Sequence, residues 1–290
     1  MSAGPEISVV VPVRDGAGSI GRCLDALALQ VNASFEVIVV DNGSTDETAS
    51  LARQHPLRPR VVTEPQPGSY AARNAGVRAA TAPVLAFTDV DCSPQPRWLS
   101  AGLATLQASG ADLVGGAITM SRTDRPTLWE HYDRAVYLRQ EDVVAHGGWA
   151  VTANLLVRRQ VFDAVGAFDA SLLSGGDREF CLRAGRAGFR IVFGPHAVVT
   201  HEPRRTRGEI WLLNKRIGGA LATLHRRGEI GPWWRSREHW MNLDWVIHLI
   251  REDGPPLRRR HVLPVHAWAM TARLYGRWLE WLRLRLRRSG

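Results

Sequence analysis

The chain has 290 residues, enough to build one large α/β domain or two closely joined halves. Hydrophobic residues make up 45% of it and charged residues 22%, as in globular proteins, and no run approaches the ~18 apolar residues of a transmembrane helix. Cys23, Cys92 and Cys181 are too far apart for a zinc motif or a disulfide framework, and residues 1–6 show no signal peptide, so a cytoplasmic setting is expected.

The formal charge of +9 comes almost entirely from arginine, since Lys215 is the only lysine, and much of it follows residue 200. Such a charge suits nucleic acid, an anionic membrane surface or a phosphorylated substrate. None of the usual nucleic-acid-binding motifs is present, so we expect no nucleic-acid partner.

The first ninety or so residues alternate between strand and helix patterns. In chain order the expected elements are a strand at 7–13, a helix at 19–30, a strand at 35–40, a helix start at 44–46, a short strand at 61–62, a helix at 68–80 and a strand from 84. This order predicts a parallel sheet with right-handed crossovers, in which ligands bind beyond the carboxyl ends of the strands. The loops at 12–15, 41–46 and 89–91 would meet there.

Two aspartates, Asp89 and Asp91, follow the apolar run 84–87. On a continuing strand both side chains would point to one face, where two carboxylates repel each other unless a cation or hydrogen-bond donors neutralise them. Oxygen ligands of this kind hold Mg²⁺ or Mn²⁺ beside a substrate's phosphates. For the two aspartates alone, a solvated turn is the competing interpretation. Glycine-rich dinucleotide and P-loop motifs are absent from the sequence.

Beyond residue 95 the pattern becomes mixed. We expect a helix at 98–109, a strand at 112–120, a polar and aromatic stretch at 122–146, a strand at 154–157, helices at 159–165 and 180–187, and strands at 190–193 and 197–200 that lead to His201.

Six short motifs follow one another along residues 7 to 201: Ser8-Val9-Val10-Val11-Pro12, Val39-Val40-Asp41-Asn42-Gly43-Ser44-Thr45-Asp46, Ala72-Arg73-Asn74-Ala75-Gly76, Phe87-Thr88-Asp89-Val90-Asp91, Gly166-Ala167-Phe168-Asp169 and Gly176-Asp177-Arg178-Glu179-Phe180-Cys181-Leu182-Arg183. With these motifs in this order, the chain resembles the inverting family 2 glycosyltransferases. The resemblance implies a GT-A fold, a mixed and mainly parallel α/β sheet flanked by helices. It also implies a nucleotide-sugar-binding half at 1–95, an acceptor-binding and catalytic half at 96–205, and a helical, Arg- and Trp-rich extension at 206–290.

The resemblance assigns nucleotide-binding roles to the first half of the chain. Asp41 would bond the nucleobase, with uracil favoured, while Pro12 and Arg14 would line its pocket. Arg73 would approach the base or the diphosphate, and Asp89 the ribose or the sugar. Relatives commonly carry an aromatic or small residue followed by asparagine where this chain has Arg14 and Asp15, which leaves the identity of the base open.

The same resemblance makes Asp91 the ligand of a Mg²⁺ or Mn²⁺ ion that bridges both phosphates. His201 would complete the metal or diphosphate site, with an ordinary surface histidine as the competing interpretation. The ion would offset charge on the nucleoside diphosphate leaving group.

Asp177 matches the family's general base, which would accept a proton from the attacking acceptor hydroxyl. One carboxylate suffices for a single displacement with inversion, unlike the two of retaining glycosidases. The glutamate that precedes this aspartate in the family is Gly176 here. Asp177 as a helix cap, and the whole chain as a non-catalytic nucleotide-sugar or glycan-binding protein, are therefore the alternatives.

Trp149 and Asn154 fall near the acceptor subsite by the resemblance, although a tryptophan is also a common core residue. The acceptor would carry a hydroxyl, on a glycan or on a lipid-linked molecule.

The last predicted helix, 265–288, has an apolar and aromatic face with Met270, Leu274, Tyr275, Trp278, Trp281, Leu282 and Leu286 and an opposite face with Arg273, Arg277, Arg283 and Arg287. One interpretation is a helix packed on the catalytic domain with its arginine side in water. The other is an interfacial helix on an anionic membrane, which would place the protein peripherally on the inner face of the membrane.

Overall fold

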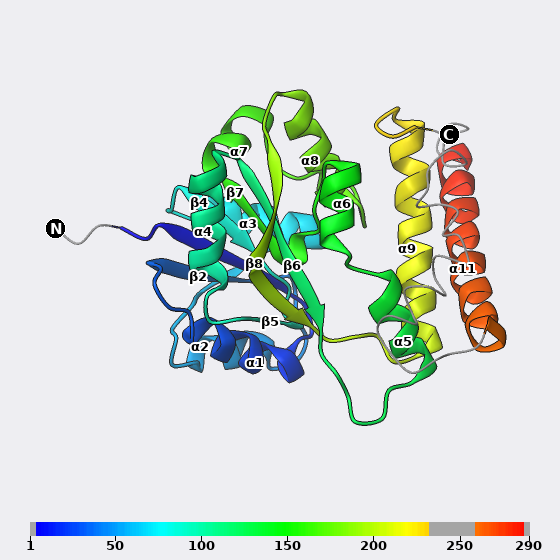
Figure 1. Cartoon of the computed structure of the whole chain (residues 1–290), viewed down its shortest axis with the longest axis horizontal. Coiled ribbons are helices and arrows are strands. Elements are labelled where there is room, and N and C mark those ends of the chain that lie inside the picture. The colour runs from blue at the N-terminus through cyan, green and yellow to red at the C-terminus, as the bar shows by residue number, and fades with distance from the viewer. Residues whose placement is uncertain (1–3, 232–258, 287–290) are drawn as a thin grey trace. The chain divides into compact units, whose positions relative to one another are not determined.

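The computed structural model describes residues 4–231 and 259–286, which fall into two compact units (Figure 1). The first unit contains residues 4–119, 139–172 and 176–202, and the second contains residues 120–138, 173–175, 203–231 and 259–286. The polar stretch after residue 119 therefore belongs with the C-terminal region, whereas the sequence placed it in the acceptor-binding half.

Eight strands of the described residues form one mixed sheet in the first unit, in the order β3-β2-β1-β4-β7-β6-β8-β5. Strands β1, β2, β3 and β4 run parallel to one another, and β4–β7, β7–β6 and β5–β8 are antiparallel pairs. The strands are β1 (Ile7–Val13), β2 (Phe35–Asp41), β3 (Arg60–Thr63), β4 (Val84–Phe87), β5 (Cys92–Pro94), β6 (Leu113–Met120), β7 (Leu155–Arg158) and β8 (Ile191–His201). The expected mixed, mainly parallel sheet is confirmed.

Helices connect these strands. They are α1 (Ala17–Ala28), α2 (Thr48–Gln54), α3 (Ser69–Ala79), α4 (Trp98–Ser109), α6 (Gln140–Gly147), α7 (Arg159–Val165) and α8 (Gly176–Arg186), with a 3₁₀ turn η1 (Thr152–Asn154). Helix α8 begins four residues earlier than the sequence pattern suggested, so Asp177 lies in its first turn.

The sheet is covered on both faces, as its almost continuous apolar strands require. On one face, alternate residues of β1 such as Val9 and Val11 share a core with Leu24 of α1 and Trp98 of α4. On the other face, Phe87 of β4 contacts Phe162 and Phe168, and this aromatic cluster extends to Phe180 of α8. The first turn of α8 is therefore anchored to the sheet through aromatic packing.

Helix α3 approaches β1 closely because Gly76 has no side chain. A Cβ at this position would overlap the side chain of Val10. Since α3 carries Arg73, this approach brings the arginine under the end of the sheet where β1 and β4 finish.

The second unit is helical in its described part, with α5 (Leu128–Val136), α9 (Arg207–Arg226) and α11 (Arg259–Leu286). Thr206 and Glu209 form a reciprocal capping box at the start of α9. The helix expected between the Gly-Pro breaks at residues 231 and 254 lies outside the described residues, as does Arg287. Among the described helices, none combines the length and apolar character that membrane crossing requires.

The packing of α11 corrects the expectation of a solvated arginine side. Arg273 and Arg277 are only 4% and 8% exposed, whereas Trp278 and Trp281 are 53% and 46% exposed. Two nitrogens of Arg273 donate hydrogen bonds to Oδ1 of the buried Asn214 of α9, at 3.2 and 2.8 Å. Small residues allow this: a Cβ at Gly218 of α9 would overlap the backbone of Arg273. The arginines thus face the neighbouring helix, and the tryptophans face outwards.

Candidate active site

The carboxyl ends of β2, β1 and β4 lie next to one another, and the loops that follow them are joined by hydrogen bonds. The backbone N–H of Asp15 donates to Ser44 Oγ at 2.9 Å, and Asp15 Oδ1 accepts from the backbone N–H of Thr45 at 2.7 Å. Asp15 has a φ of +50°, in the left-handed region, so this unusual residue pair after β1 serves to tie two loops together. The side chain of Arg14 beside it is exposed, and Pro12 is buried in β1.

Asp41 ends β2 and is buried. Its Oδ1 accepts a hydrogen bond from the backbone N–H of Ser44 at 3.1 Å. The next residue, Asn42, organises the surrounding loop: its side chain donates to the carbonyl groups of Glu64 and Gln66 and accepts from the N–H of Gly68. Asn42 was not singled out by the sequence, although it stands directly after Asp41.

Asp89 and Asp91 do not share a face, because β4 ends at Phe87 and the chain turns before β5 begins. Asp89 Oδ1 lies 2.5 Å from Nη2 of Arg73, a side chain on α3 that is almost fully buried. Nε of this buried arginine has no hydrogen-bond partner among the described residues. The Arg73–Asp89 pair therefore presents a polar, partly unsatisfied surface at the rim.

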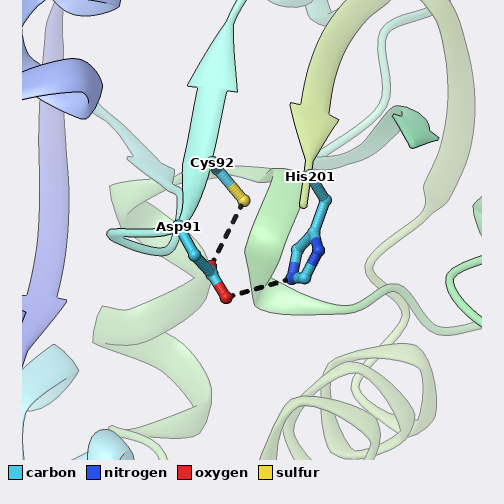
Figure 2. A group of neighbouring side chains, drawn as sticks. All are labelled: Asp91, Cys92 and His201. Atoms are coloured by element: carbon cyan, nitrogen blue, oxygen red, sulfur yellow. Dashed lines mark hydrogen bonds and ion pairs between the residues drawn. The ribbon is translucent and has the colours of Figure 1, made fainter. Parts of the chain in front are cut away.

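Asp91 faces the other way, towards His201 at the end of β8 (Figure 2). The antiparallel register pairs Cys92 with His201, which brings the carboxylate and the imidazole together. His201 Nε2 lies 3.4 Å from Asp91 Oδ2, and His201 Nδ1 lies 2.6 Å from the carbonyl oxygen of Glu202. A carbonyl can only accept, so Nδ1 carries the proton, and in the neutral ring Nε2 offers its lone pair on the side of Asp91.

The donor set suits a divalent ion. Atoms of Asp91, Cys92 and His201 lie within 4.8 Å of one another. Carboxylate oxygen and imidazole nitrogen, the latter oriented by a carbonyl, are ligands that Mn²⁺ accepts, and the carboxylate also suits Mg²⁺. Burial, together with the charges of Asp89 and Asp91, raises the pKa of the Cys92 thiol well above its usual range, so the sulfur is a poor ligand. Asp91 and His201 are therefore the residues that fit.

Asp177 lies in the first turn of α8 and is buried. Its Oδ1 accepts from the backbone N–H of Arg178 at 2.9 Å and from the Tyr70 hydroxyl at 3.2 Å, and its Oδ2 accepts from the N–H of Thr152 at 3.4 Å. Burial raises the pKa of Asp177, more than the Arg178 N–H and the charge of Arg73 lower it. A carboxyl with a raised pKa is suited to accept a proton near neutral pH.

Gly176 stands where the resemblance expects a glutamate, and the ring of Tyr70 explains the difference. A Cβ at position 176 would lie 2.8 Å from Cε2 of Tyr70, closer than real side chains pack. The tyrosine ring thus takes the space beside Asp177 that a side chain at 176 would need.

Comparison with known proteins agrees with this geometry. Residues 8–166 match the model of glycosyl transferase family 2. The chain is also 36% identical over 239 residues to glycosyltransferase AglE of Haloferax volcanii, across 80% of this chain and 76% of that protein. The chain belongs to glycosyl transferase family 2.

Solved structures support the GT-A fold of this glycosyltransferase. A mannosyltransferase from Pyrobaculum calidifontis, solved with GDP-mannose and Mn²⁺, superposes with a TM-score of 0.65 at 20% identity, over 96% of this chain and 87% of that one. Glucosyl-3-phosphoglycerate synthase from Mycobacterium tuberculosis, solved with UDP and Mn²⁺, gives 0.55 at 23% identity, over 79% and 82%.

The two expected acceptor residues of the glycosyltransferase differ in their surroundings. Trp149 is partly exposed, its ring lies 5.5 Å from the guanidinium carbon of Arg178, and its indole N–H has no partner among the described residues. Asn154 is fully buried: its Oδ1 accepts from the indole N–H of Trp98, and its Nδ2 donates to the carbonyls of Ala117 and Ala197. The amide of Asn154 is thus used in packing, which leaves its expected acceptor role without a free group.

Tyr70 is the site residue that sequence reasoning missed. Its spacing from Arg73 and Asn74, three and four positions on a helix, was the available signal, because such residues share one helix face.

Proposed function

We propose that this glycosyltransferase moves a sugar from a nucleoside diphosphate sugar, with UDP as the nucleotide, to an acceptor hydroxyl with inversion at the anomeric carbon. The observation that carries the proposal is Asp177, a buried carboxylate with a raised pKa at the start of α8, in the same unit as the paired loops of β1, β2 and β4.

Asp177 acts as the general base in a single displacement. The acceptor oxygen forms a bond to the anomeric carbon as the bond from that carbon to the diphosphate oxygen breaks, and the acceptor's proton goes to Asp177. The electron pair of the broken bond leaves on the nucleoside diphosphate. Because one displacement occurs on the face opposite the leaving group, the configuration inverts.

Asp41 and the Arg73–Asp89 pair bind the donor. One oxygen of Asp41 is occupied by the Ser44 N–H, and the other can accept from an N–H group of the base. A uracil imide and a guanine both offer such a donor, and Pro12 and the exposed Arg14 lie beside β2 at this edge. Arg73, with its unpartnered Nε, supplies a buried positive charge to the diphosphate or ribose side.

A Mg²⁺ or Mn²⁺ ion held by Asp91 and His201 would supply positive charge that stabilises the diphosphate leaving group. The chain's own contribution is to hold the two side chains together: β5 and β8 fix the backbone, and the Glu202 carbonyl fixes the imidazole.

The acceptor hydroxyl belongs to a glycan or a lipid-linked molecule, with Trp149 on the acceptor side. The outward face of α11 supports contact with an anionic membrane, which would make the protein peripheral. Tyr275, Trp278 and Trp281 are exposed there, and cations accompany them: Lys215 Nζ lies 5.7 Å from the Tyr275 ring, and the guanidinium carbon of Arg285 lies 3.9 Å from the Trp281 ring. Exposed aromatic rings with nearby cations suit the headgroup region of anionic lipid.

The test is Asp177→Asn, which keeps the size of the side chain and removes the base. UDP-glucose, UDP-N-acetylglucosamine and GDP-mannose, each with Mn²⁺, are scored by thermal shift, and turnover is measured with the donors that bind. We expect turnover to fall roughly 10²- to 10⁴-fold while donor binding persists. Unchanged turnover would refute the base assignment, and stabilisation by GDP-mannose alone would refute UDP as the nucleotide.

A further inference from the structure

Tyr70 joins two parts of the site that the proposed function treats separately. It lies on α3 three residues before Arg73, its hydroxyl reaches Asp177, and its ring lies under the Arg73 guanidinium at 5.4 Å. One helix therefore carries both the partner of the donor-side Asp89 and a partner of the proposed base.

The orientation of Tyr70 is held by its surroundings. Asn74, one position after Arg73, exchanges two hydrogen bonds with the backbone of Phe168, at 2.8 and 3.0 Å. The Phe168 ring in turn packs 5.8 Å from the ring of Tyr70, which is itself only 5% exposed. The absence of a side chain at Gly176 lets the Tyr70 ring approach α8.

The hydrogen bonds of Asp177 are unevenly divided between its two oxygens. Oδ1 accepts two bonds, from the Arg178 N–H and the Tyr70 hydroxyl, at 2.9 and 3.2 Å. Oδ2 accepts only one bond from the described residues, a long one of 3.4 Å from the Thr152 N–H. Bonds of that length are weak.

We propose that Tyr70 is a positioning residue for Asp177: its hydroxyl holds Oδ1, which leaves Oδ2 as the atom that takes the acceptor's proton. The inference rests on the proposed role of Asp177 as the base. Tyr70 neither donates nor removes a proton in the reaction; it fixes the rotation of the carboxylate and thereby the direction from which the acceptor hydroxyl must approach.

A stability measurement tests the hydrogen bond without any substrate. Tyr70→Phe keeps the ring and removes the hydroxyl. A hydrogen bond to an ionised carboxylate favours the ionised form, so its stabilising contribution is present above the pKa of Asp177 and is lost as the pH falls through it. We expect Tyr70→Phe to lower the melting temperature by about 2–4 °C more at pH 7 than at pH 4. In an Asp177→Asn background this pH dependence should disappear.

Tyr137→Phe is the matched control, because it removes another buried tyrosine hydroxyl whose partner, the Asn214 amide, does not titrate. Its loss of melting temperature should be the same at both pH values. If Tyr70→Phe also gave a loss independent of pH, or kept its pH dependence in the Asp177→Asn background, the proposal would be overturned.

Turnover then separates this inference from the proposed function. With whichever of the three nucleotide sugars is turned over, Tyr70→Phe should lower kcat about tenfold at neutral pH, shift the acidic limb of the pH profile upwards and leave the donor KM unchanged. If Asp177→Asn abolishes turnover while Tyr70→Phe leaves kcat and the limb unaltered, only the positioning role fails. If Asp177→Asn retains turnover, the base assignment itself fails.

Discussion

Asp89 and Asp91 are separated by a single residue, yet they have different partners. Asp89 pairs with a buried arginine, while Asp91 faces an imidazole whose other nitrogen is held by a carbonyl. The turn between β4 and β5 causes the divergence, because a continuous strand would have kept both carboxylates on one face. The sequence predicted separate roles for the two aspartates through the family resemblance, and the geometry is compatible with those roles.

Replacing Asp91 by alanine should remove the effect of Mn²⁺ on nucleotide binding. Ligands that bind the folded state stabilise it by RT ln(1 + [L]/Kd), about 2.7 kcal/mol at a hundredfold excess over Kd. We expect the extra thermal shift of Mn²⁺ with UDP, over UDP alone, to vanish in Asp91→Ala and to shrink in His201→Ala. Asp163→Ala, at an exposed carboxylate of α7, should keep it. An undiminished shift in Asp91→Ala would contradict the site.

The burial of Asp177 predicts the acidic limb of the pH–activity profile. Burial raises the pKa of this carboxyl above its usual value of about 3.9. The base must be ionised to act, so activity should be lost as the pH falls through this raised pKa rather than near that of an ordinary aspartate. Measuring kcat from pH 4 to 8 locates the midpoint, and a midpoint at or below ordinary aspartate values would contradict the proposed role.

At the scale of elements, the first strands and helices were predictable because their patterns are local. Runs such as Ile7–Val13 and Phe35–Asp41 are β-branched and apolar, and the helices between them have apolar faces of helical spacing. Strand β5 could not be found this way, since its three residues include Pro94 and its hydrogen bonds come only from β8. Tyr70 likewise meets Asp177 only through tertiary packing of α3 and α8.

The outward tryptophans of α11 could not be predicted for a different reason. A helical projection separates two faces but does not tell which one meets a neighbour. Here the glycines of α9 and the Asn214 acceptor decide it, by allowing Arg273 to be buried with a hydrogen-bond partner. Burial and the neighbouring Arg273 lower the pKa of Arg277 to about 10, so it remains charged at neutral pH.

Close packing of α9 and α11 predicts that Gly218→Ala destabilises the protein. The added methyl would overlap the backbone of Arg273, and overpacking of this kind costs about 1–3 kcal/mol. Gly208→Ala, in the first turn of α9, is the control: its Cβ would meet only Thr206 at 3.9 Å. Because alanine is the better helix former, that variant should be neutral or stabilising. Urea unfolding of both variants compares the two sites, and equal stability would argue against the close approach.

At the scale of the whole molecule, the sequence separated a catalytic region from a helical extension near residue 205, and residues 203–231 and 259–286 do belong to a unit distinct from the sheet. It could not place residues 120–138, because that stretch has few apolar residues of regular spacing. Its helix α5 is defined by tertiary contacts, such as Tyr132 with Val262 and Val265 of α11.

The aromatic face of α11 predicts binding to anionic vesicles. The full chain should sediment with vesicles that contain phosphatidylglycerol and much less with phosphatidylcholine alone. Trp278→Ser with Trp281→Ser should reduce sedimentation, because interfacial binding scales with buried apolar area. Replacing the exposed Leu29 of α1's C-terminal cap by serine is the control for a lost apolar surface residue in the other unit. Equal sedimentation with both vesicle types would contradict the proposal.

The pairing of β5 with β8 also bears on how the protein is made. Asp41, Arg73, Asp89 and Asp91 all emerge from the ribosome well before His201, which ends the last strand to join the sheet. A nascent chain can therefore assemble the nucleotide side of the rim while the imidazole is still missing, since domains begin to fold from their N-terminal parts during synthesis. Shared grip on an ion by Asp91 and His201 is then a property that only the finished sheet has.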